Sequence, residues 1–500
     1  MQQICLLKVI AKTIIFFFAG GIMSKEKSFV SVLKLNKLGF NKDLNTKVSE
    51  HIKKKLSVQS VILFYQLAVM FNLGAICKIT KSYIESFFAT IIESKNFLEL
   101  EFVFLAKLLS SSCLNIDSEI EIFMASDKWL SYKTEGRCKF AEELLSKIRF
   151  PLLFDSELKY INSYPSSFSK NKDCIAILNN VLNKKEYFLM KKSSLLFKQR
   201  SSSQNNYNIL VCGGLKYFRD TKSFEALKNV TKVDSNNFEI VESLTSMTSA
   251  RLDVKAVCLK GNLYILDSKD SNETRVKYIE KYSILDSCWS ILTNMYDDRI
   301  CYSICSFLNK IYLVGGLVDH SDHSFVDSYL QLDPNCADKN KIWKKIAKAS
   351  QKIKHGSCAV FQGKIVVSGG RIGGGRYLNT VESYDVIDNK WSRMANTIRR
   401  RSPHKLVVVQ NKLFVIGIDT VQCEVYDSSC KRFAALKFNS FIKFHDVLKV
   451  LSVGSKILVF TNRRISTIYC YDVKTNEWSE KILPVSDYLS YFSLVKIPSY

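Results

Sequence analysis

The C-terminal three-fifths of the chain repeats one arrangement of apolar and polar residues. A short run of β-branched residues ends at small residues, a second apolar run follows after a loop, and a large aromatic residue comes shortly afterwards. The arrangement is most complete in residues 364–391, KIVVSGGRIGGGRYLNTVESYDVIDNKW. Short apolar runs bounded by turn residues are typical of β-strands. A few such strands cannot bury their aromatic residues alone, so the pattern predicts a fold built from packed copies.

Six copies can be aligned on the apolar run that starts each one. They begin 44 to 54 residues apart, at Asn208, Asn262, Lys310, Lys364, Lys412 and Lys456. Three of the runs end in glycine pairs, which are Gly213-Gly214, Gly315-Gly316 and Gly369-Gly370. Paired glycines favour a sharp turn or a backbone too close to its neighbour for a Cβ atom. A repeat of about 50 residues with a Gly-Gly strand indicates the blades of a kelch β-propeller.

Large aromatic residues recur downstream of the strands with a constant separation of seven residues. The pairs are Tyr282 and Trp289, Tyr384 and Trp391, Tyr426 and Phe433, and Tyr471 and Trp478. We expect these rings to fill the wedges between neighbouring sheets.

The last residues of the chain are predicted to close the ring. In the middle copies a further apolar run comes first, as residues 358–361 precede Lys364, but only polar residues precede Asn208. A spare strand-like run lies at residues 491–497. We expect it to complete the first blade, because closure removes the exposed edges of an open sheet.

The chain ahead of the repeats is predicted to be helical. Apolar residues at three- and four-residue spacing indicate helices over 51–56, 61–71, 83–92 and 98–109. A further helix is expected to be capped by Asp117 or Ser118 and to continue to Trp129. Pro151 marks a stop.

Charge and cysteine content narrow the class of protein. The net charge of +25 suits acidic partners, but the basic residues are spread along the chain and no RNA-binding motif is present, so we predict no nucleic-acid partner. The fifteen cysteines are scattered, without a Cys-x-x-Cys motif, which favours free thiols and a cytoplasmic location. The apolar run at 14–23 could be the core of a signal peptide, although it is too short to span a membrane.

Enzymatic chemistry has little support. A copper-oxidase site in a propeller would need a tyrosine and two histidines at the ring axis. The histidines cluster only in the loop segment Asp319-His320-Ser321-Asp322-His323, where polar residues are expected in any case. The glycines at 373–375 lack the strand and helix of a nucleotide site. We therefore predict no catalytic residues, no metal and no cofactor.

Basic residues recur in the loops that should surround one mouth of the propeller. Arg371 and Arg376 follow a Gly-Gly strand, and a second group precedes the first strand of a following blade, comprising Arg251, Arg299, Arg399, Arg400, Arg401 and His404. Guanidinium groups match carboxylates with paired hydrogen bonds, so these residues are the predicted partner-binding set for an acidic segment of a target protein. The alternative is that they form a solvated basic surface.

The segment at 114–153, LNIDSEIEIFMASDKWLSYKTEGRCKFAEELLSKIRFPLL, resembles the BACK domain of BTB–BACK–kelch proteins. Residues 57–88 are similar to the first BACK helices, and IIFFFAG at 14–20 resembles a late part of a BTB domain. The Lys-, Asn- and Ile-rich composition is most similar to poxviral kelch-like proteins. The implied multidomain order is a BTB remnant at 1–50, a helical BACK domain at 51–160, the end of BACK and a basic, polar linker at 161–207, and an all-β, six-bladed kelch propeller at 208–500.

The resemblance implies a non-enzymatic adaptor in which the propeller binds a target protein and the BTB/BACK arm links it to a cullin-RING ubiquitin ligase, in a virus modulating host pathways. Its kelch relatives use arginines in the mouth loops to hold acidic peptides. The front part of a BTB domain, which in the family carries dimerisation and much of the cullin contact, is not found in the roughly 50 residues ahead of BACK. Dimerisation and cullin binding therefore stay open. The alternative is a structural or decoy protein that binds a host factor or the cytoskeleton and recruits no ligase.

Overall fold

We describe the fold from a computed structural model of the chain. The described residues are 56–70, 74–183, 200, 207–218, 223–266, 269, 274–284, 286–318, 326, 329–417, 423–436, 447–461, 467–482, 489–490 and 492–498. The predicted BTB remnant, residues 184–199 and 201–206 of the predicted linker, and the histidine cluster at 319–323 lie outside them.

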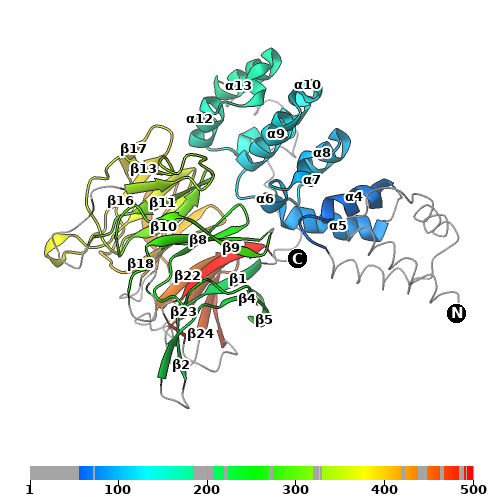
Figure 1. Cartoon of the computed structure of the whole chain (residues 1–500). Coiled ribbons are helices and arrows are strands. Elements are labelled where there is room, and N and C mark those ends of the chain that lie inside the picture. Colours follow the sequence, from blue (N-terminus) through cyan, green and yellow to red (C-terminus); the bar gives the residue numbers. More distant parts are fainter. Residues whose placement is uncertain are drawn as a thin grey trace, which may run out of the picture.

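The N-terminal part of the described chain is helical, shown from blue to teal in Figure 1. Its α-helices are α4 (Val61–Met70), α5 (Gly74–Ser86), α6 (Phe88–Ile91), α7 (Lys95–Leu98), α8 (Phe102–Leu109), α9 (Ile120–Tyr132), α10 (Thr134–Arg137), α11 (Ala141–Leu145), α12 (Asp155–Ser163) and α13 (Lys172–Asn183). They share one apolar core that includes the buried rings of Phe88, Phe123 and Trp129. The start of α9 differs from the prediction: Glu119 is its N-cap without a side-chain cap, and Ser118 Oγ only accepts a 3.3 Å bond from Ile120 N.

Two charged residues of the BACK-like segment stabilise this helical core. The guanidinium of Arg137 lies 3.8 Å from the Trp129 ring centroid. Glu119 is buried and receives Arg200 Nε at 2.6 Å and the backbone N–H of Arg149 at 3.2 Å. Arg200 comes from the predicted linker and also donates to the Lys147 carbonyl at 2.8 Å. These contacts of the buried Arg200 guanidinium hold the chain against the helices shortly before the propeller begins.

The rest of the described chain is an all-β propeller of six four-stranded antiparallel sheets, which confirms the predicted fold class. In order from the channel outward, blade 1 is β27 (Ser493–Pro498), β1 (Tyr207–Cys212), β4 (Val230–Asp234) and β5 (Ile240–Leu244), and blade 2 is β6 (Ala256–Leu259), β7 (Asn262–Ile265), β8 (Tyr278–Ser283) and β9 (Cys288–Asn294). Blade 3 is β10 (Ser303–Phe307), β11 (Lys310–Val314), β12 (Tyr329–Leu332) and β13 (Trp343–Ile346), and blade 4 is β14 (Ser357–Phe361), β15 (Lys364–Ser368), β16 (Val381–Asp385) and β17 (Lys390–Arg393). Blade 5 is β18 (His404–Val409), β19 (Lys412–Gly417), β20 (Glu424–Asp427) and β21 (Arg432–Ala435), and blade 6 is β22 (Val447–Val453), β23 (Lys456–Thr461), β24 (Thr467–Asp472) and β25 (Glu477–Ile482). The six aligned runs of the sequence are the second strands.

The C-terminal strand β27 is the innermost strand of blade 1. It pairs antiparallel with β1, with Asn208 opposite Ile497. Ser493 Oγ accepts a 3.2 Å hydrogen bond from Ala256 N at the start of β6, so the last strand also contacts blade 2. A separate small sheet of β26 (Leu489–Ser490), β2 (Leu215–Phe218) and β3 (Ser223–Ala226), which projects at the bottom of Figure 1, has no counterpart in the sequence pattern.

The glycine pairs lie where blades 1, 3 and 4 pass the loop that leads into the next blade. All six glycines have positive φ, between 53° and 111°. A Cβ on Gly213 would lie 2.8 Å from the Arg251 carbonyl oxygen, and one on Gly315 would lie 2.5 Å from that of Ile353. A side chain would therefore force neighbouring blades apart.

The aromatic pairs lie at the outer part of the blades. Tyr384 and Trp391 face each other across β16 and β17, with ring centroids 5.0 Å apart. Trp391 Nε1 also donates to the Ala347 carbonyl at the end of blade 3, at 2.7 Å. Trp343 lies opposite Leu332 and makes the corresponding 3.0 Å bond to Asn294 O. With Trp289, which donates to the Thr245 carbonyl at 2.7 Å, these indoles connect blades 2, 3 and 4 to the preceding blade.

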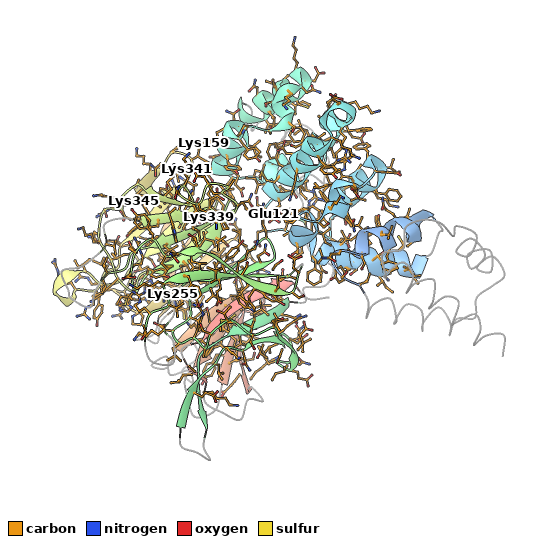
Figure 2. All side chains as sticks on the ribbon, viewed as in Figure 1. Glu121, Lys159, Lys255, Lys339, Lys341 and Lys345 are labelled. Carbon is orange, nitrogen blue, oxygen red and sulfur yellow. The ribbon has the colours of Figure 1, made fainter. Side chains whose placement is uncertain are left out.

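The helical region contacts the turns between the first and second strands of blades 2, 3 and 4. Ser156 Oγ in α12 donates to Gly363 O at 2.6 Å, Lys260 pairs with Glu93 at 3.2 Å, and Leu308 joins the helical core. Lys159 of α12 also pairs with Asp388 in blade 4 at 2.5 Å. Figure 2 shows Glu121 and Lys159 on the side of the helices that faces the propeller. The helices therefore lie at one end of the channel.

Candidate functional site at the channel mouth

The opposite end of the channel is formed by the loops that enter the first strand of each blade and those that leave the second strand. These loops are joined by backbone hydrogen bonds. Lys354 N donates to Arg371 O at 3.0 Å and Arg371 N donates to Lys354 O at 2.8 Å. Arg401 N donates to Leu378 O at 3.0 Å. All eight basic residues predicted to bind a partner lie in or beside such loops.

Three of the predicted partner-binding arginines are buried in ion pairs. Arg251 and Glu280 have fully buried side chains and pair at 2.7 Å, and Arg299 pairs with Asp297 at 2.7 Å. Arg401 is paired with Glu424, and both side chains are almost wholly buried. A buried ion needs such a partner because its desolvation is costly. Burial leaves these three side chains no surface for a target, which corrects the sequence prediction for Arg251, Arg299 and Arg401.

Arg251 and Arg401 instead connect neighbouring blades. The Arg251 carbonyl accepts from Gly214 N of blade 1 at 2.9 Å, while its guanidinium pairs with Glu280 on the third strand of blade 2. The Arg401 carbonyl likewise accepts from Gly370 N of blade 4 at 3.0 Å. The signal that sequence reasoning missed is the glutamate on the third strand of each of these blades.

His404 is also removed from the predicted binding set. It is 2% exposed, and its Nε2 lies 2.6 Å from Ser368 Oγ of the preceding blade. Burial, followed by the nearby charge of Arg401, lowers the pKa of His404 to about 3, so the ring is neutral at physiological pH. Its role in this structure is to join blades 4 and 5.

The other four predicted residues gather on the surface of the mouth. Arg376, Arg399 and Arg400 are exposed, and Arg371 is half-buried. Arg371 Nε is buried and has no hydrogen-bond partner among the described residues. We call these four residues the rim arginines. The arrangement leaves their charges available to a ligand.

Two large apolar side chains stand among the rim arginines. Tyr377 is 47% exposed and Ile398 is 52% exposed. Tyr377 directly follows Arg376 in the sequence, and Ile398 directly precedes Arg399. Exposed aromatic and apolar residues beside arginine are typical of the centres of protein–protein interfaces. Sequence analysis did not single out either residue.

Three lysines on the inner wall of the channel were also missed. Lys255 immediately precedes β6, Lys405 is in β18 and Lys449 is in β22. Burial and the neighbouring positive charges lower the pKa of Lys405 to about 8 and that of Lys449 to about 7. Each lysine interrupts or borders an apolar strand, so a lysine at the start of a first strand is the signal that could have found them.

The described residues contain no group of three or more His, Cys, Asp or Glu side chains that could hold a metal ion. Every cysteine in the described part of the chain is free. Among the described helices, none has the length and apolar character needed to cross a membrane.

Comparison with known proteins adds to this geometry. The family model BACK (BTB And C-terminal Kelch) matches residues 61–162, and the Kelch motif model matches residues 354–397, which include Arg371 and Arg376. Kelch-like protein 31 of Danio rerio is 25% identical over 289 residues, or 56% of this chain and 44% of that protein. Kelch-like protein 25 of Xenopus tropicalis is 21% identical over 482 residues, or 93% and 79%. Kelch-like protein 7 of Rattus norvegicus is 24% identical over 450 residues, or 86% and 72%. The match thus spans less than half the length of the first of these relatives.

Proposed function

We propose that this chain, which has the BACK domain and kelch propeller of kelch-like proteins, is a non-enzymatic adaptor that binds a target protein at the channel mouth. The observation that carries the proposal is the position of the four rim arginines. They lie in the same two loops as the exposed Tyr377 and Ile398, at the end of the propeller opposite the helices, and backbone hydrogen bonds such as Arg401 N to Leu378 O join these loops. The target would be recognised through an acidic segment, because the guanidinium fork of arginine matches a carboxylate.

The helical region would present the bound target to a second protein. Direct contacts, among them Ser156 with Gly363 and Lys260 with Glu93, hold the helices against three blades. A target at the mouth would therefore be held in a fixed position relative to the BACK helices. We propose a cullin-RING ubiquitin ligase as that second protein, and a cytoplasmic location, with which the free cysteines agree. The similarity to poxviral proteins stays a prediction from residue usage.

The mouth is tested by charge reversal and affinity capture. Full-length protein with Arg371→Glu and Arg400→Glu should lose the partners that the unmodified chain captures from cell extract, as identified by mass spectrometry. The control carries Lys344→Glu and Arg432→Glu, which change two exposed residues on the outer strands β13 and β21. Equal capture by the mouth variant and the unmodified chain would exclude the rim arginines as the binding site.

The ligase is tested in the same experiment. A cullin should co-purify with the unmodified chain and also with the mouth variant, because the substitutions lie away from the helices. If targets are captured but no cullin is found, the chain is a structural or decoy binding protein instead.

A further inference from the structure

The channel of the propeller contains a cluster of lysines that partner binding at the rim does not use. The first strands follow one another around the ring in the order β27, β6, β10, β14, β18 and β22, and each contacts the next. In a ring of this order, β6 and β18 lie on opposite sides of the channel. Lys255 beside β6 and Lys405 in β18 nevertheless interact electrostatically, and Lys449 in β22 interacts with both. The three ammonium groups therefore converge on the channel from different sides.

Little in the protein compensates these charges. Among the described residues, Lys405 and Lys449 have neither an ion pair nor a hydrogen bond through Nζ. Lys255 Nζ lies 5.5 Å from the ring centroid of Tyr302, a weak interaction that does not neutralise its charge. Asp253 is the carboxylate that acts on Lys405 and Lys449, and it is exposed. Lys354 and Arg371 add positive charge at the same end. Burial, followed by the charges of Lys255, Lys354 and Arg371, lowers the pKa of His355, so its ring does not add to that charge, and the Cys358 thiol lies near Lys405.

We infer that Lys255, Lys405 and Lys449 form a binding site inside the channel for a small, multiply charged oxyanion of the phosphate class. Like charges brought together in a half-buried position repel one another, and an anion between them converts that repulsion into attraction. Ammonium groups act as compact point charges suited to phosphate oxygens, whereas the planar arginines of the rim suit carboxylates. Lys405 and Lys449 project from strands of the ring, and Lys255 directly precedes one, so the site is held in place before the ligand arrives.

This inference is independent of the target-binding proposal. The rim arginines lie in loops on the surface. Lys255 directly precedes an inner strand, and Lys405 and Lys449 lie within the first three residues of inner strands. Figure 2 shows Lys255 within the propeller, away from the helices. An anion can occupy the channel whether or not the rim holds a peptide, so each site can be removed without the other.

Calorimetric titration of the full-length chain with inorganic pyrophosphate tests the site. We expect saturable binding at one site per chain, weakened about tenfold or more by Lys405→Met or Lys449→Met because each removes an ammonium group that would face the bound anion. The matched control Lys344→Met removes an exposed lysine from the outer strand β13 and should bind as the unmodified chain does. The rim variant Arg371→Glu with Arg400→Glu should retain most of its pyrophosphate binding.

Thermal unfolding of each variant separates loss of the site from loss of the fold. Methionine keeps most of the lysine stem and removes the repelling charge, so both channel variants should unfold at or above the temperature of the unmodified protein. Absence of saturable binding, or equal affinity in the folded channel variants and the Lys344→Met control, would overturn the inference. Binding that disappears in the rim variant while the channel variants retain it would assign the anion to the rim and would also contradict it.

Discussion

The buried pair of Arg251 and Glu280 allows a quantitative test of how the loop that enters blade 2 is held to that blade. Replacing Arg251 with methionine keeps much of the side-chain volume but leaves Glu280 as a buried, unpaired carboxylate. Both side chains are fully buried, and Glu280 retains a 3.3 Å hydrogen bond from Thr248 N. Breaking a buried pair by removing one partner costs about 3–5 kcal/mol, so we expect Arg251→Met to lower the free energy of unfolding by that amount.

The exposed Arg399 supplies the matched comparison, because a surface substitution away from special features changes stability by about 0.5 kcal/mol or less. Denaturant unfolding followed by circular dichroism and tryptophan fluorescence measures both variants. The double variant Arg251→Met with Glu280→Met should recover most of the loss, since replacing both ions of a buried pair with apolar residues is often close to neutral. If Arg251→Met is as stable as Arg399→Met, the buried ion pair does not stabilise blade 2, contrary to this account.

Three further perturbations test other parts of the structure. Gly261→Ala should loosen the helices from the propeller, because the new Cβ would lie 1.8 Å from Thr90 Oγ1. Gly374→Ala is the control, since Gly374 has a similar positive φ and no atom lies within 4 Å of its Cβ. Amide hydrogen exchange in α6 should be faster only in Gly261→Ala, and equal exchange in both variants would contradict a contact between α6 and the propeller. The pKa of His404 is lowered to about 3 in the folded protein, against an ordinary value of 6.5, so the unfolded chain binds the proton more readily. The contribution of His404 to the free energy of unfolding should therefore fall as the pH drops below about 6.5, by up to ~1.4 kcal/mol per pH unit. Melting curves of His404→Gln should lack this pH-dependent loss, and a pH profile identical to that of the unmodified chain would refute the prediction. Deletion of residues 492–498 removes β27 from blade 1 and should abolish cooperative unfolding of the propeller, an expectation that an unchanged melting transition would contradict.

The repeated part of the fold could be predicted from the sequence because the same physical requirement recurs in each copy. Gly213, Gly315 and Gly369 each pass close to a loop of the next blade, and this steric need is visible as a glycine pair. The aromatic residues Tyr384 and Trp391 keep their separation because a short turn joins the strands on which they face each other. The small sheet of β2, β3 and β26 could not be predicted, since it is not part of the repeat.

The candidate site was predicted only in part. Arg251 and Arg400 occupy loops of the same kind, but one is buried and the other exposed. The difference depends on a glutamate in a strand distant in the sequence, which local spacing cannot reveal. Lys255, Lys405 and Lys449 are far apart along the chain and come together only when the ring closes. A single lysine beside an apolar strand gives no sign that two others face it.

The central claim is that the channel mouth binds a target protein, and site-specific photocrosslinking tests it most directly. A photoreactive phenylalanine analogue at Tyr377, 47% exposed at the mouth, should crosslink to the captured target in cell extract. The same analogue at Ile291, 61% exposed on the outer strand β9, serves as the comparison and should give no crosslink to that target. Crosslinking at position 291 with none at position 377 would show that the target binds the outer wall of the propeller, contrary to this account.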